Sequence, residues 1–134
     1  MADRIIRGVR VATTSGVQPA AVYIEAGQVV AVTGYEDVPR VGAIEELNKS
    51  LLMPALALVA VSEVSRVLAE EWTRMREQDI RLETLIAKLC IVSAVQEGMA
   101  ADLIIWNPEY AITSTSPPLY GVVREVMIAG RVLA

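Results

Sequence analysis

The side chains in this sequence that could do chemistry are one thiol and several carboxylates, and no histidine is present to activate them. A thiol nucleophile or a general acid needs a neighbouring group that exchanges its proton. Cys90 lies in an apolar run, so we expect a buried structural thiol. The adjacent pairs Glu45-Glu46 and Glu70-Glu71 point in different directions on a strand or helix, and we interpret them as solvated surface carboxylates. We therefore predict no catalytic residue.

Neither a metal site nor a cofactor site is predicted. Protein zinc sites are built mostly from histidine and clustered cysteine, and the chain has no histidine and one cysteine. Trp72 and Trp106 are of a type that can line a ligand pocket, but core packing is the simpler interpretation of both.

Composition and charge narrow the class of protein. Apolar residues make up 54% of the sequence, which favours a strongly buried sheet or a chain that hides apolar surface against a partner. No phenylalanine is present, so we expect an aliphatic core. The net charge of -4 argues against nucleic acid as a partner, because phosphate binding needs clustered basic residues.

The sequence also bears on the cellular compartment. A single cysteine allows no internal disulfide and suits a reducing environment. Charged residues interrupt the N-terminal region, which argues against a signal peptide. The longest apolar stretch, from Leu51 to Val61, is shorter than the roughly 20 residues that span a bilayer. We therefore expect a cytoplasmic protein with no membrane contact.

Residues 1–54 have the pattern of β-strands. Apolar and charged residues are interleaved there, and turn-forming residues separate the runs. Ala26-Gly27 is short enough for a tight hairpin in which Gly27 takes a positive φ. The expected strands are residues 5–11, 20–25, 28–33, 44–47 and 51–53, with a turn at 13–16 and a loop at 34–42.

Residues 62–95 change to a helical period. Apolar residues recur at steps of three and four, which predicts two helices that form a hairpin packed on each other or on the sheet. Ser62 is the expected N-cap of the first helix and Asp79 that of the second. The expected apolar positions are Val64, Val67, Leu68, Trp72 and Met75 in the first helix and Leu82, Leu85, Ile86, Leu89 and Cys90 in the second.

Residues 99–134 return to the strand pattern. Leu103–Trp106 is a continuous apolar run, and Ala129-Gly130 joins two further strands into a hairpin. In the first strand of this hairpin, alternation places Val126 on one face and Val123 with Met127 on the other. The expected strands are 103–106, 110–113, 122–128 and 131–133, with an extended turn at Pro117-Pro118.

The order of strands, two helices and strands predicts an α+β fold in a single domain, residues 1–134. Strands separated by a helical insert must still pair to bury their apolar faces. We therefore expect one β-sheet assembly made from both chain ends, residues 1–54 and 99–134. Residues 55–98 form the helical insert.

Short motifs at both ends of the chain carry a family resemblance. The N-terminal motifs are Arg7-Gly8-Val9-Arg10-Val11, Ala26-Gly27-Gln28-Val29-Val30-Ala31-Val32 and Met53-Pro54-Ala55. The C-terminal motifs are Gly98-Met99-Ala100-Ala101-Asp102-Leu103-Ile104 and Ala129-Gly130-Arg131-Val132. In this order the motifs resemble the amidohydrolase superfamily, especially its allantoinases, hydantoinases and dihydroorotases. The resemblance implies that Asp102 lies in a turn or begins a strand.

The resemblance implies the fold of the family, but this sequence lacks the residues on which the activity of the family depends. In that family the two end segments form a composite β-sandwich, and a metal-binding (β/α)₈ barrel lies between them in sequence. Leu58, Ala60 and Ser62 stand where the resemblance places the Asp-x-His-x-His motif, and only Ser62 offers a ligand atom, which binds Zn²⁺ poorly. The insert is also far too short for a barrel of roughly 200 residues or more. It is either a remnant of the barrel, which we favour for its second helix, or an unrelated helical bridge.

Two functions follow from these observations. The first is a non-catalytic, truncated relative of the amidohydrolases that acts as an interaction or oligomerisation module, with a second copy or a partner protein. On this hypothesis the sheet face that would pack on the barrel is covered by the two helices or by another copy. The alternative is one part of a metal-dependent hydrolase of cyclic amide C–N bonds, whose catalytic barrel another chain supplies.

Overall fold

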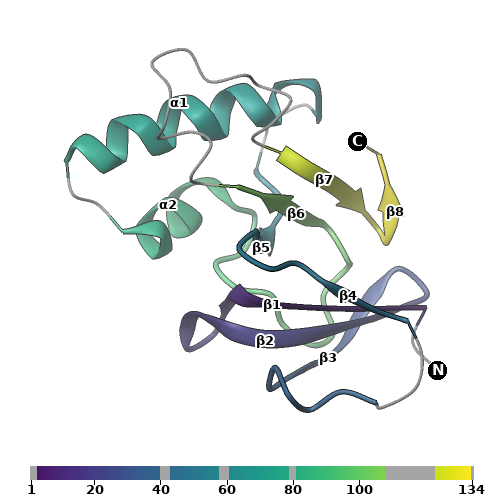
Figure 1. Cartoon of the computed structure of the whole chain (residues 1–134). Helices are drawn as coiled ribbons and strands as arrows, with labels where there is room; N and C mark the ends of the chain where they lie inside the picture. The colour runs from purple at the N-terminus through teal and green to yellow at the C-terminus, as the bar shows by residue number, and fades with distance from the viewer. Residues whose placement is uncertain (1–2, 40–42, 58–60, 79–80, 108–122, 134) are drawn as a thin grey trace.

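A computed structural model describes residues 3–39, 43–57, 61–78, 81–107 and 123–133. These residues form one eight-stranded sheet and two α-helices (Figure 1), so the predicted α+β class is confirmed. The elements in chain order are β1 (Arg4–Thr13), β2 (Gly16–Glu25), β3 (Gln28–Thr33), β4 (Ile44–Glu46), β5 (Leu51–Pro54), the 3₁₀ turn η1 (Val61–Glu63), α1 (Val64–Glu77), α2 (Leu82–Leu89), β6 (Leu103–Trp106), β7 (Val123–Ile128) and β8 (Arg131–Val132).

Strands from both halves of the chain lie side by side in the sheet. The strand order is β3-β2-β1-β5-β6-β7-β8, and β4 pairs with β1 off this path. β5 is the junction, because Leu52 lies opposite Val11 in a parallel pairing and opposite Ile105 in an antiparallel one. All the described strands therefore belong to one hydrogen-bonded sheet, and the division into the two layers of a sandwich stays a prediction.

The first hairpin is longer than the sequence pattern predicts. β1 continues to Thr13 and β2 begins at Gly16, so that Pro19 lies inside a strand. Proline has no N–H to donate to a neighbouring strand, and the pairing of the two strands shifts register between Gly8 and Val11 of β1. This β-bulge accommodates Pro19 and lets β2 begin at Gly16, earlier than expected.

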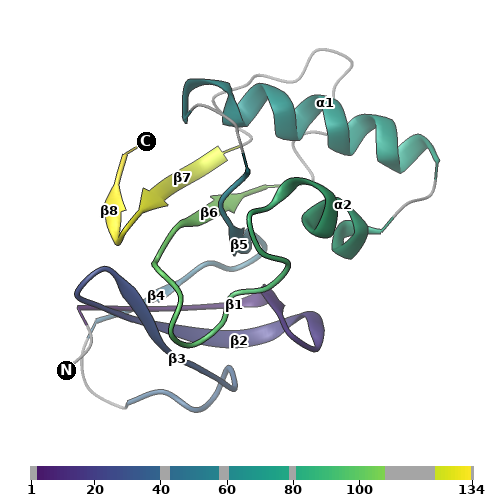
Figure 2. The ribbon, with the colours of Figure 1, turned by 180° about the vertical axis from the view of Figure 1, so that it is seen from behind.

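Two apolar clusters lie on opposite faces of β5, β6 and β7. The helix cluster includes side chains of α1 and α2, and the sheet cluster includes side chains of β1, β2 and β3. Figures 1 and 2 show the two helices on one side of β5, β6 and β7 and the strands β1, β2 and β3 on the other. Side chains that alternate along a strand point to opposite faces, so Leu51 and Met53 belong to the helix cluster and Leu52 to the sheet cluster. The helix cluster includes Leu68, Trp72, Leu85, Ile86, Ile104 and Trp106, and the sheet cluster includes Ile6, Val22, Val29, Leu103, Ile105 and Met127.

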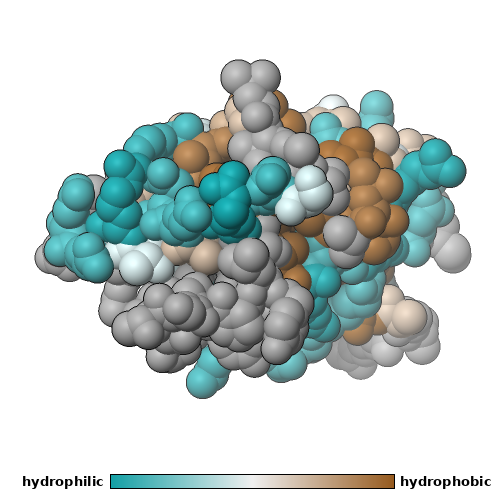
Figure 3. Space-filling view, turned by 90° about the horizontal axis from the view of Figure 1, so that it is seen from above, coloured by the Kyte–Doolittle hydropathy of each residue, from teal (hydrophilic) through white to brown (hydrophobic). Residues whose placement is uncertain are grey.

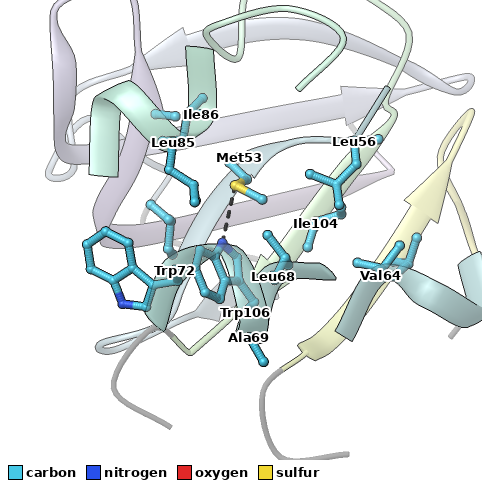
Figure 4. Packing of buried hydrophobic residues seen from close by; sticks show 14 of the residues in the cluster. Met53, Leu56, Val64, Leu68, Ala69, Trp72, Leu85, Ile86, Ile104 and Trp106 are labelled. Carbon is cyan, nitrogen blue, oxygen red and sulfur yellow. Dashed lines mark hydrogen bonds between the residues drawn. The ribbon is translucent and has the colours of Figure 1, made fainter. Parts of the chain in front are cut away.

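Both helices cover one face of the sheet through the expected apolar positions. Leu68 and Trp72 of α1 and Leu85 of α2 are buried in the helix cluster together with Trp106 (Figure 4). The indole N–H of Trp106 donates to the Met53 sulfur at 3.2 Å, so this buried donor has a hydrogen-bond partner. The outer surface of α1 is hydrophilic (Figure 3). The two helices therefore cover this face of the sheet, and its identity with the face that would pack on a barrel stays a prediction.

The expected helix caps are not found. Ser62 lies within η1, ahead of the start of α1, so it is not the N-cap. Glu63 instead forms an ion pair with Arg66 at 2.6 Å, an i,i+3 contact that stabilises the first turn modestly. Asp79 lies outside the described residues, and Arg81, which precedes α2, makes no capping hydrogen bond through its side chain. Neither described helix is long and apolar enough to cross a membrane.

β7 departs from simple alternation. Val123, expected on the face of Met127, packs instead with Val126 in the helix cluster, while Met127 lies in the sheet cluster. The cause is a shift in the β6–β7 pairing next to Trp106, where Arg124 has no opposite residue. The expected strand at 110–113, the turn at Pro117-Pro118 and the strand start at Val122 lie outside the described residues.

Candidate functional site

The positions that the family resemblance aligns with metal ligands do not form a site in the described structure. Leu58 and Ala60 lie outside the described residues, and Ser62 is exposed in η1. Within the described ranges, no three His, Cys, Asp or Glu side chains are grouped so that they could hold a metal ion. The expected absence of a metal and of a cofactor stays a prediction.

Cys90 ends α2 and is partly buried. Its N–H donates to the carbonyl of Ile86 at 3.0 Å, and it forms an isolated β-bridge with Leu56. Burial raises the pKa of the Cys90 thiol to about 12, so the reactive thiolate is scarce at neutral pH. This arrangement favours a structural thiol over a nucleophile.

The adjacent carboxylates are held by basic side chains. Glu45 accepts hydrogen bonds from Arg4, and Glu46 accepts one from Arg7 at 3.1 Å. The side chains of Glu45 and Glu70 are 44% and 63% exposed, as expected for surface carboxylates, whereas those of Glu46 and Glu71 are partly buried, at 32% and 27%. Sequence reasoning missed these ion pairs because the arginines lie far upstream and meet the carboxylates only through the β1–β4 pairing.

Arg4 joins three strands of the sheet. Its Nε and Nη2 donate to Glu45 of β4 at 2.7 and 2.6 Å, and its Nη1 donates to Glu125 of β7 at 2.8 Å. The hydrogen bond with Glu45 is the main cause that raises the pKa of Arg4, and the same hydrogen bond lowers the pKa of Glu45. The Arg4 network therefore connects the first strand to the C-terminal hairpin.

We expect the Arg4 network to make stability depend on pH at the acid end. Because the pKa of Glu45 is lowered in the folded state, its contribution is complete above the usual glutamate pKa of about 4.3 and is lost as pH falls through the lowered value. Urea unfolding should show that Arg4→Ala loses about 1 kcal/mol at roughly pH 7 and clearly less at roughly pH 3. Equal losses at both pH values would contradict this expectation.

Tyr35 and Arg7 hold the segment after β3 against β1 and β4. The Tyr35 hydroxyl donates a hydrogen bond to Glu46 Oε1, which raises the pKa of Tyr35. The guanidinium of Arg7 lies 4.4 Å from the centroid of the Tyr35 ring and donates to the Tyr35 carbonyl at 3.2 Å. These contacts fix the segment, and we assign them a structural role.

Two glycine turns from distant parts of the chain touch each other. Gly27, between β2 and β3, has φ +78°, and Gly130, between β7 and β8, has φ +79°. Ala101 lies between them, because its N–H donates to the Gly27 carbonyl at 2.8 Å and its carbonyl accepts from Gly130 at 3.0 Å. Asp102 Oδ1 accepts from the Ala129 N–H at 2.7 Å. Asp102 therefore fixes the turn between β7 and β8.

A polar cleft with a volume of about 520 Å³ lies beside the turn between β1 and β2. Its walls are this turn, the middle of β2, the end of β3 and residues 95–97. Its base includes Ala20 and Val95, which are nearly fully buried, and its rim carries hydroxyl and amide groups. The sequence identifies residues 13–16 only as a turn, because the opposite wall comes from a segment far along the chain.

Comparisons with known proteins add a distant structural likeness. No family model matches the sequence, and no curated protein matches it. Among solved structures the chain is similar to E. coli guanine deaminase, with 11% sequence identity and a TM-score of 0.30. The match covers 56% of this chain and 27% of that chain. Because the sequence identity and the TM-score are this low, the family relationship indicated by the motifs stays a proposal.

Proposed function

We propose that this chain is a non-catalytic relative of the amidohydrolases, whose two ends build a composite β-sandwich that serves as an oligomerisation module. The proposed partner is a second copy of the chain. The observation that carries the proposal is a group of exposed apolar side chains on the C-terminal hairpin. Ile128 is 37% exposed, Val132 56% and Leu133 54%.

The two edges of the sheet differ in a way that supports this choice of surface. At the β3 edge, Val29 donates to the Met99 carbonyl at 2.8 Å and accepts from the Gly98 N–H at 2.7 Å, so that edge is partly covered. Among the described strands, β8 pairs with β7 alone. β8 is a short edge of two residues, Arg131 and Val132, and it carries neither a proline nor a bulge that would prevent another strand from pairing with it. The open edge is therefore the proposed contact.

A second copy is the proposed partner because one strand edge can pair with itself about a two-fold axis. Such an isologous contact uses the same residues from both chains and closes as a dimer. Antiparallel pairing across the axis would satisfy the outward backbone groups of β8, and it would remove Val132 and Leu133 from water. The high apolar content of the sequence, 54%, agrees with a chain that hides surface on assembly.

Size-exclusion chromatography with light scattering tests the oligomerisation module. We expect the mass of two chains for the wild type and of one chain for Val132→Lys, because a lysine on the edge opposes strand pairing. Val9→Lys is the matched control, since Val9 is 44% exposed on β1, away from the hairpin. A wild-type monomer, or a dimer that survives Val132→Lys, would overturn the proposal.

The non-catalytic part of the proposal is tested by the metal content of the purified chain. We expect no stoichiometric zinc, because the sequence has no histidine and one cysteine, the residue types from which most protein zinc sites are built. Stoichiometric zinc bound by this chain alone would contradict the proposal. Co-purification with a separate barrel subunit would support the alternative, in which the chain is one part of a hydrolase of cyclic amide C–N bonds.

A further inference from the structure

The polar cleft beside the β1–β2 turn has the dimensions of a small-molecule site. Its volume of about 520 Å³ falls within the range of about 300–1,000 Å³ that is typical of ligand pockets. Among its lining residues, Ala20 and Val95 are nearly fully buried, whereas Gln18 and Gln96 are exposed. A cleft of this size with exposed polar side chains along its walls suits a ring-sized polar ligand.

Hydrogen bonds hold the walls of the cleft in place before any ligand binds. The Thr13 hydroxyl donates to the Gly16 carbonyl at 2.8 Å, which fixes the turn, and the Val95 N–H donates to the Ala12 carbonyl at 2.7 Å. The Thr33 hydroxyl donates to the Asp37 carbonyl at 2.9 Å at the end of β3. A preformed site loses less conformational entropy when a ligand binds.

The free polar groups of the cleft define the ligand chemistry. The side chains of Gln18, Gln96 and Glu97 make no hydrogen bond or ion pair with other side chains of the described ranges, and Thr14 and Ser15 expose hydroxyls at the turn. Glu97 is the one charged residue among the described residues that line the cleft. Amides and hydroxyls suit a ligand with several hydroxyl groups, and a lone carboxylate favours a cation over an anion.

We propose that this cleft binds a small polyhydroxylated amine in its protonated form, with the ammonium group at Glu97 and the hydroxyl groups at Gln18 and Gln96. An amino sugar has this chemistry. The inference does not depend on self-association, because the residues of the cleft and those of the C-terminal hairpin are different.

Titration followed by ¹H–¹⁵N NMR tests the cleft with three sugars that share one ring. Glucosamine carries a positive charge, glucose is neutral and glucuronate carries a negative charge. We expect glucosamine to shift the amide signals of residues 13–16 and 95–97, with glucose binding about three to five times more weakly and glucuronate weaker still. Equal binding of all three sugars, or shifts elsewhere on the protein, would overturn the proposal.

Two variants separate binding in the cleft from contact with the general surface. Glu97→Gln should reduce the affinity for glucosamine to that for glucose, whereas Glu77→Gln on the exposed face of α1 should leave it unchanged. Gly34 lines the cleft, and a Cβ atom there meets nothing within 4 Å, so Gly34→Leu can place a side chain across the cleft without a clash at its base. Glucosamine affinity should fall at least about tenfold in Gly34→Leu. Wild-type affinity in a folded Gly34→Leu variant would exclude the cleft.

Discussion

Gly130→Ala is expected to lower the free energy of unfolding by about 2–4 kcal/mol, the sum of backbone strain and overpacking. Gly130 has φ +79°, a conformation that L side chains adopt at a cost. A Cβ atom at this position would lie 2.9 Å from the Cα atom of Gly27. The contact is between two backbones, so no flexible side chain can move aside to relieve it.

Gly98→Ala is the matched control for this prediction. Gly98 has φ +93°, but a Cβ atom there meets nothing within 4 Å. The control therefore has the strain without the clash and should lose only about 1 kcal/mol in the same denaturant titration. Equal losses for Gly98→Ala and Gly130→Ala would show that the close approach of the two glycine turns contributes nothing to stability.

Leu68→Ala is expected to lower the free energy of unfolding by about 2–5 kcal/mol, the usual range for a leucine deleted from a core. Leu68 is fully buried in the helix cluster and attaches α1 to the sheet. Loosening of α1 should also shift tryptophan fluorescence to longer wavelength, because Trp72 and Trp106, the two tryptophans of the chain, lie in the same cluster. Both changes can be followed in one urea titration.

Glu70→Ala is the control for Leu68→Ala on the same helix. Its side chain is 63% exposed and pairs with Arg66 at 3.2 Å, so its removal should change stability by less than about 0.5 kcal/mol. A loss of less than about 0.5 kcal/mol for Leu68→Ala as well would mean that α1 does not pack on the sheet in solution.

Local patterns in the sequence predicted much of the fold. β3 spans the predicted residues 28–33, because Ala26-Gly27 forms the expected two-residue turn with positive φ at both positions and so fixes where the strand begins. The apolar face of α2 was also predicted, and Leu85 and Ile86 are buried as expected. These features depend on residues close together in sequence, which is why periodicity and turn chemistry find them.

Features that depend on distant segments could not be predicted. The partner of Glu45 is Arg4, on a strand whose parallel pairing with β4 no local pattern indicates. The position of Val123 depends on a register shift against β6. The polar cleft requires the β1–β2 turn and residues 95–97 to meet, and only the pairing of the whole sheet brings them together. Ser62 failed as a helix cap because a 3₁₀ turn precedes α1.

The position of β5 has a consequence for how the protein folds as it is synthesised. β5 lies between β1, from the start of the chain, and β6, from its second half, and both clusters need all three strands. The ribosome releases the N-terminal strands first, so their apolar faces stay uncovered until β6 and β7 emerge. Strand pairing over such sequence separations is slow. The nascent chain therefore exposes the edge of β5 during translation until β6 pairs with it, and the later strands β6 and β7 complete both apolar clusters.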